Sequence, residues 1–193
     1  MSIPAQAVVT PVPSLRRLVR IIALAWFAVV SLDFFLNAGL LARFYQWDLP
    51  GFLPPLKMFQ LIPLGYAAFL LWSILLVWLM TRLSIGGFRA GAGFGLKVGV
   101  LLAAAGFCGE LSIFAFPAKM LLIWMVVNTL SFTVGGAVAG AGLAAPRLRP
   151  LVLGVVALFL VCLVGGLVLQ NFGPNPAAKM APGRVGIGWS EKR

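Results

Sequence analysis

Five apolar runs, each long enough to cross a lipid bilayer, constrain the fold of this chain more than any other feature of its sequence. They lie at residues 21–42, 59–80, 98–116, 120–145 and 151–169. A helix needs about 20 mainly apolar residues to span a hydrocarbon core about 30 Å thick, because each residue adds about 1.5 Å. We therefore predict an all-α, polytopic membrane protein with a bundle of five transmembrane helices.

The amino-acid composition supports this class. Hydrophobic residues make up 62% of the 193 residues and charged residues 10%, whereas soluble domains average about 45–50% and about 25%. A water-soluble domain of this length cannot bury so much apolar surface, so we expect the lipid bilayer to cover it. The predicted organisation is an N-terminal arm at 1–20, a membrane domain at 21–170 and a flexible, basic C-terminal tail at 171–193.

The sequence lacks the side chains of the common catalytic and metal sites. It contains no histidine, and its two cysteines, Cys108 and Cys162, both lie within apolar runs. Haem ligation by histidine, histidine-bound zinc and a Cys–His nucleophile are therefore excluded. We expect no metal, no cofactor and no catalytic residue, and we predict that the protein is not an enzyme.

A glycine-rich run at 86–95 has the G-x-G spacing of some phosphate-binding loops. Such a loop follows a strand and needs a downstream acidic residue or a Lys-Ser/Thr pair. This run has neither a predicted strand before it nor those residues after it. We expect it to form a flexible cytoplasmic turn.

Basic residues predict the orientation of the spans, because cytoplasmic flanks are enriched in Lys and Arg. The arm and the loops after the second and fourth spans hold eight of them: Arg16, Arg17, Arg20, Arg82, Arg89, Lys97, Arg147 and Arg149. The loops after the first and third spans hold three: Arg43, Lys57 and Lys119. We predict a cytoplasmic N-terminus in a cell membrane, and the composition favours the inner membrane of a bacterium. Most of the 15 Lys and Arg behind the net charge of +11 lie in these flanks, so nucleic acid is not an expected partner.

Two acidic residues, Asp33 and Glu110, interrupt the first and third spans. A charged side chain in the middle of a bilayer costs at least about 2.5 kcal/mol unless it is paired or neutral, so it marks a functional site by default. Each lies twelve residues beyond the cytoplasmic start of its span, roughly 18 Å along the helix and past the midplane. Asn37, Tyr66 and Asn128 fall at similar depth, so we predict one buried polar layer that could hold a solute or a proton.

Helices three and four are expected to form an antiparallel hairpin around a short turn at 117–119. Reflection about that turn pairs small residues on two helix faces, which is how membrane helices approach closely. The predicted pairs are Gly95 with Gly142, Gly99 with Ala139, Ala103 with Gly135, Gly106 with Ser131 and Glu110 with Asn128. In this register Asn128 hydrogen-bonds Glu110, which makes Glu110 a packing residue. Asp33, with Asn37 at i+4 on the same helix face, is then the stronger functional candidate.

The small-residue faces and the missing catalytic chemistry favour a non-enzymatic role. We predict an interaction, assembly or accessory subunit that forms a homo-oligomer or binds other membrane subunits. The alternative is a small-solute or ion carrier that uses the Asp33–Glu110 layer and, with five spans, works as an oligomer. A third interpretation is that the acids are neutral or hydrogen-bonded and only fix helix packing.

Overall fold

The computed structural model describes residues 13–41, 53 and 55–172, and within these residues the chain is all-helical. The helices are α1 (Leu15–Phe34), the π-helix η1 (Phe35–Leu40), α2 (Pro55–Arg82), α3 (Phe88–Ile113), α4 (Ala118–Ala144) and α5 (Arg149–Phe172). Among the described residues, five helices are long and apolar enough to cross a membrane, with α1 and η1 forming one of them. The prediction of an all-helical fold with five such helices is confirmed.

Both ends of the helical region extend beyond the predicted spans. Residues 15–20 of the predicted arm already belong to α1, and Asn171 and Phe172 of the predicted tail belong to α5. The rest of the arm, apart from Pro13 and Ser14, and the tail from 173 onward lie outside the described residues.

Helix α3 begins ten residues earlier than expected, at Phe88 rather than at Val98. The glycine-rich run that we predicted to be a flexible turn is therefore largely helical. Glycine weakens an isolated helix by about 1 kcal/mol per residue relative to alanine, so packing against a neighbour must compensate. That neighbour is α4, with which α3 makes the most extensive helix–helix contact in the described structure.

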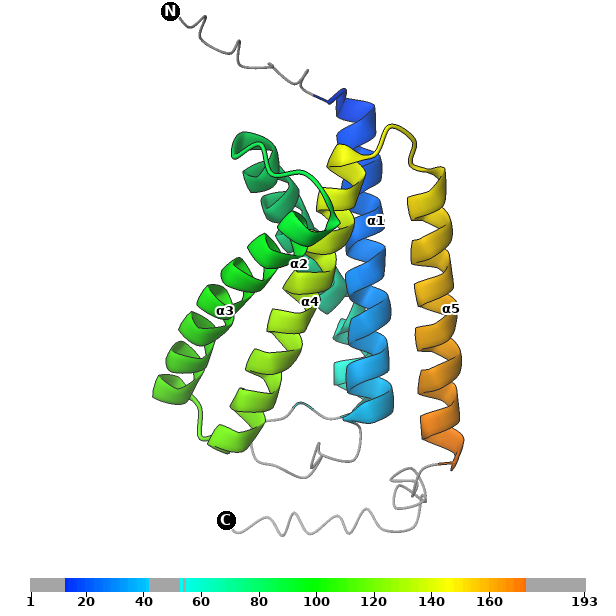
Figure 1. Cartoon of the computed structure of the whole chain (residues 1–193). Coiled ribbons are helices and arrows are strands. Elements are labelled where there is room, and N and C mark those ends of the chain that lie inside the picture. The colour runs from blue at the N-terminus through cyan, green and yellow to red at the C-terminus, as the bar shows by residue number, and fades with distance from the viewer. Residues whose placement is uncertain (1–12, 42–52, 54, 173–193) are drawn as a thin grey trace, which may run out of the picture.

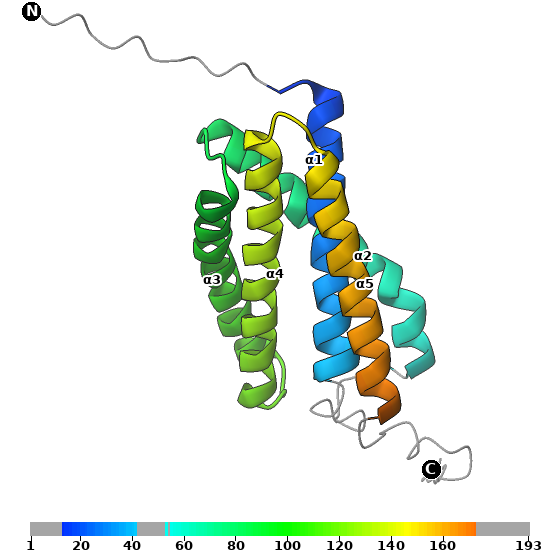
Figure 2. The same ribbon diagram turned by 45° about the vertical axis from the view of Figure 1, so that its right-hand side comes forward.

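Helix α4 is the centre of the bundle. Figures 1 and 2 both show it between α3 on one side and α1 on the other, and α5 follows on the far side of α1. In Figure 2, α2 crosses obliquely behind α1. The core lies where α1, α2, α4 and α5 meet, and its residues are Ile21, Ala25, Ala28, Leu76, Val77, Met80, Phe132, Val138, Ala139 and Val155.

Arginines mark one end of the bundle, which we call the basic end: Arg16, Arg17, Arg20, Arg82, Arg89, Arg147 and Arg149. Arg17 holds α1 to α4 there, because its guanidinium donates to the carbonyl oxygens of Gly142, at 3.0 Å, and Ala145. The last carbonyls of a helix have no partner within the helix and carry partial negative charge, so a cation stabilises them. Arg17 therefore acts as a cap for α4 supplied by a different helix.

Glycines let α3 and α4 meet backbone to backbone. A Cβ atom on Gly91 would overlap the Gly136 carbonyl oxygen, and one on Gly95 would overlap that of Phe132. Close approach of this kind increases dispersion contact and permits weak Cα–H···O bonds.

The predicted register of this hairpin is wrong. Gly95 faces Gly136 rather than Gly142, and Gly99 faces Phe132 rather than Ala139, a displacement of about two helical turns along α4. The physical reason is the position of the turn. Helix α3 ends at Ile113, so the connection lies at 114–117 instead of 117–119.

The shifted register also changes the face of α4 that meets α3. A Cβ on Gly135 would lie 3.0 Å from Cγ2 of Val29, and one on Gly142 would lie 3.0 Å from Cγ1 of Ile21. The predicted stripe, Ser131, Gly135, Ala139 and Gly142, is buried, and its two glycines pack against α1. The predicted partner Gly106 makes no close contact, because a Cβ there would have no described atom within 4 Å.

Candidate functional site

Asp33 lies two residues before a change in helix type, from α-helix to π-helix at Phe35. The Asn37 amide donates to Oδ1 of Asp33 at 2.6 Å, in keeping with their i, i+4 spacing. Asp33 belongs to α1 and Asn37 to the π-helix η1, where the Leu41 N–H donates to the Leu36 carbonyl five residues back at 2.7 Å. Single π-turns are rare and frequently occur at functional sites.

Helix α5 supports the π-helix. A Cβ on Gly39 would lie 3.1 Å from Cα of Gly166, so the two backbones are close. Nε2 of Gln170 donates to the Ala38 carbonyl oxygen at 3.0 Å and satisfies one acceptor near the end of η1. Gly166 and the side-chain amide of Gln170, both on α5, thus pack against the widened turn that carries Asn37.

Tyr66 of α2 belongs to the same region. Its side chain is within electrostatic range of the Asp33 carboxyl. Its carbonyl oxygen accepts a hydrogen bond from Nε1 of Trp26 at 2.8 Å, which ties α2 to α1. Asp33 and Asn37 are therefore directly hydrogen-bonded, and Tyr66 lies on the neighbouring helix within electrostatic range of Asp33; we call these three predicted polar residues the Asp33 cluster.

Glu110 and Asn128 line a separate cavity of about 150 Å³ between α3 and α4, closed on one side by Trp72 of α2. No hydrogen bond joins either side chain to another residue in the described part of the chain, so the predicted Glu110–Asn128 bond is not formed. The register explains this difference. Gly99 faces Phe132, so Asn128, one turn before Phe132, falls level with Ala103, which lies about two turns from Glu110.

The two acids do not share a site. The Glu110 cavity is lined by residues of α2, α3 and α4, whereas the Asp33 cluster involves α1, η1 and α2. Helix α4 separates α3 from α1 in both views (Figures 1 and 2). The single polar layer predicted from depth along the helices is therefore divided into two regions.

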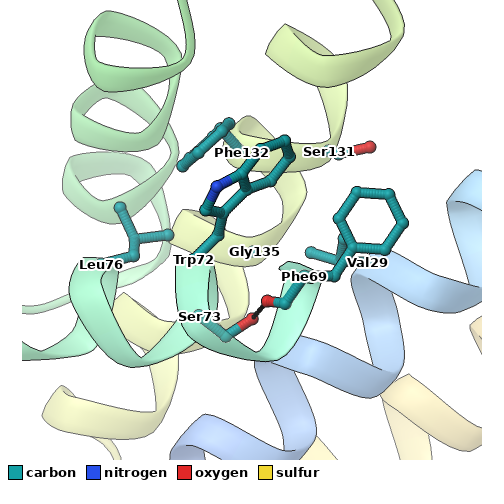
Figure 3. A pocket seen from close by; sticks show the side chains of 8 residues that line it. All are labelled: Val29, Phe69, Trp72, Ser73, Leu76, Ser131, Phe132 and Gly135. Carbon is teal, nitrogen blue, oxygen red and sulfur yellow. Dashed lines mark hydrogen bonds between the residues drawn. The ribbon is translucent and has the colours of Figure 1, made fainter. Parts of the chain in front are cut away.

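A smaller cavity lies inside the core, where α1, α2 and α4 meet (Figure 3). Its volume is about 10 Å³, enough for about one water molecule and far too small for a solute. The Ser73 hydroxyl on its wall donates to the Phe69 carbonyl at 2.9 Å. The Ser131 hydroxyl, 1% exposed, has no hydrogen-bond partner among the described residues. This polar group was predicted only as a helix-packing residue.

The sequence contained partial signals for the residues that were missed. Gln170 is a polar residue at the end of an apolar run, and the Gly165–Gly166 pair marks a place for close contact, but neither feature predicts a π-helix in α1. Trp72 belongs to a span without acidic residues and has no sequence feature that links it to Glu110. In the described ranges, no three His, Cys, Asp or Glu side chains lie together as a metal site would require.

Comparison of the chain with protein-family models, with curated proteins and with solved structures found no match.

Proposed function

We propose that this chain is a multi-pass membrane protein of a bacterial inner membrane. It acts, without catalysis, as an interaction, assembly or accessory subunit. The observation that carries the proposal is the Glu110 cavity. Its two polar side chains lie within helices apolar enough to cross a membrane and have no partner within the described part of the chain.

The free-energy cost of unpaired polar groups in hydrocarbon is the reason why this cavity favours a partner helix. A carboxyl that faces lipid is unfavourable whether it is charged or merely without a hydrogen-bond partner. A helix from a second subunit that lies over the cavity would remove lipid from Glu110 and Asn128 and offer them a donor or acceptor. Hydrogen bonds between membrane helices typically contribute about 0.6–2 kcal/mol.

The surroundings of the cavity have the exposure that such a partner requires. The second half of α3, which lines the cavity, is largely exposed, including Leu111 and Ile113. We propose a second copy of this chain as the occupant, with another membrane subunit as the other outcome of the test.

The test is the oligomeric state of the full chain in lipid bilayers at several protein densities. Glu110→Leu should weaken association by about 3- to 30-fold if the side chain bonds the partner, while Glu110→Gln keeps a polar group and should retain most of it. Leu101→Ala is the matched control, because Leu101 is 70% exposed on the same helix. A protein that is monomeric at every density and recovers no membrane subunit would contradict the proposal.

The orientation with a cytoplasmic N-terminus is part of the proposal and is supported by the seven arginines at the basic end. A reporter that is active only in the cytoplasm, fused after Arg193, should be silent if five spans place the tail outside. Activity of that reporter would overturn the arrangement.

A second candidate function, a small-solute or ion carrier, is favoured by the π-helix beside Asp33. It would use the Asp33 cluster alone, because Glu110 lies in another region. A solute that binds the folded protein must raise its thermal stability by mass action. Asp33→Asn should abolish that stabilisation and Glu110→Gln should leave it unchanged; if no solute or cation stabilises the protein, the carrier function fails.

A further inference from the structure

A groove of about 760 Å³ opens between α1 and α5 at the basic end. Both helices begin at this end and run in the same direction (Figure 1). The lining repeats one pattern on the two walls: an arginine, then two apolar residues three and four positions later. The residues are Arg20, Ala23 and Leu24 on α1, and Arg149, Val152 and Leu153 on α5.

The two arginines are available for a ligand. Neither forms an ion pair or a side-chain hydrogen bond with another residue in the described part of the chain, in contrast to Arg17, which is bound to α4. Asp33, the one described acid of α1, lies thirteen residues beyond Arg20, roughly 20 Å away along the helix. The groove entrance is therefore positively charged, and the helix N-terminus at Arg149 adds partial charge of the same sign.

Spacing along the helices separates charge from apolar surface. Residues three and four positions after an arginine lie on the same face, one turn deeper into the bundle. In a membrane-spanning bundle, this places two guanidinium groups at the level of the lipid headgroups and four apolar side chains at the level of the upper acyl chains. Guanidinium groups bind phosphate oxygens in a bidentate manner.

We propose that the α1–α5 groove is a binding site for an anionic phospholipid. Arg20 and Arg149 hold the phosphate and the negatively charged headgroup, and an acyl chain lies between Ala23–Leu24 and Val152–Leu153. Basic pockets between transmembrane helices bind anionic headgroups in this way. The site is independent of the Glu110 cavity and of any partner bound there.

The experiment measures lipid binding to the full-length protein in nanodiscs of phosphatidylcholine with a minor fraction of phosphatidylglycerol. The readout is the amount of each lipid that stays with the protein after transfer to detergent and washing, quantified by mass spectrometry. We expect phosphatidylglycerol to be enriched in the wild type. The double variant Arg20→Gln/Arg149→Gln should lower that enrichment by about tenfold or more, because each arginine near the headgroups contributes substantially to anionic-lipid binding.

The matched control is Arg82→Gln/Arg89→Gln, which removes the same charge from the same end of the bundle outside the groove. It should change the enrichment by less than about twofold if the groove is the site. Equal loss in both double variants, or no enrichment in the wild type, would overturn the proposal, because the basic end would then act only as a diffuse charge.

Ala23→Trp tests the acyl-chain part of the groove at constant charge. It should lower phosphatidylglycerol retention, whereas millimolar inorganic phosphate should not displace the lipid. Displacement by phosphate together with full retention in the Ala23→Trp variant would indicate a simple anion site and overturn the proposal. Val152→Trp, on the opposite wall, makes the same test if Ala23→Trp does not fold.

Discussion

The two halves of the α3–α4 hairpin use glycine differently, although both contain it. Toward the basic end, Gly91 and Gly95 of α3 meet the backbone of α4 at Gly136 and Phe132. Toward the opposite end, Gly106 of α3 has no close neighbour, and the helices enclose the Glu110 cavity. The difference shows that a glycine permits close helix packing only where the facing helix presents a small residue or its own backbone.

Gly95→Ala should have the largest effect on stability among the changes that test this comparison. The added methyl group would overlap the Phe132 carbonyl oxygen, and both backbones would have to separate. We expect a loss of about 2 kcal/mol or more in the free energy of unfolding, measured by denaturant titration in mixed micelles. A loss below about 0.5 kcal/mol would contradict the close backbone contact.

Arg17→Gln tests whether the basic half is also held by electrostatics. It removes a charge-assisted hydrogen-bond donor from the Gly142 and Ala145 carbonyls, and bonds of this type contribute about 1.5–3 kcal/mol. We expect the free energy of unfolding to fall by about 1.5–3 kcal/mol, seen as a lower denaturant concentration at the midpoint of unfolding. Arg16→Gln, at an exposed position on the same helix, is the control and should leave the midpoint nearly unchanged.

Gly106→Ala reports on the open half and should act in the opposite direction to Gly95→Ala. A methyl group at Gly106 meets no described atom within 4 Å, while alanine favours the helix by about 0.5–1 kcal/mol. The same unfolding titration should show unchanged or slightly raised stability. Equal destabilisation by the two substitutions would remove the distinction between the halves.

Ser131→Ala is expected to have the smallest effect. The Ser131 hydroxyl is buried without a partner in the described structure, so its removal eliminates a desolvation cost rather than a hydrogen bond. The free energy of unfolding should stay within about 0.5 kcal/mol of the wild type or rise. A loss above about 1 kcal/mol would show that the hydroxyl is hydrogen-bonded, through a water molecule in the cavity of Figure 3.

The number and approximate position of the helices could be predicted because apolar length alone determines them. The register of the α3–α4 hairpin could not, because it depends on where α3 stops. Hydropathy continues through Phe114 and Phe116, whereas the helix ends at Ile113, and an error of a few residues at a turn displaces every facing pair.

For the candidate site, contacts within one helix could be predicted from the sequence, and contacts between helices could not. The i, i+4 spacing correctly placed Asn37 beside Asp33, since both belong to one continuous helix. The separation of Asp33 from Glu110 depends on the order of helices around α4, and hydropathy contains no information about that order. The π-helix packs Gly39 against Gly166, which lies more than a hundred residues away in sequence, and no local pattern predicts that contact.

The bond between Arg17 and the end of α4 has a consequence for how the chain is made. Its acceptors lie 125 and 128 residues downstream of the donor, so α1 is synthesised long before the carbonyls that it caps. The α3–α4 hairpin, in contrast, can close as soon as its own two helices have been made, because its contacts are close in sequence. Helix α1 is therefore made well before its arginine can reach these acceptors, and its buried residues gain their contacts with α4 and α5 only late in synthesis.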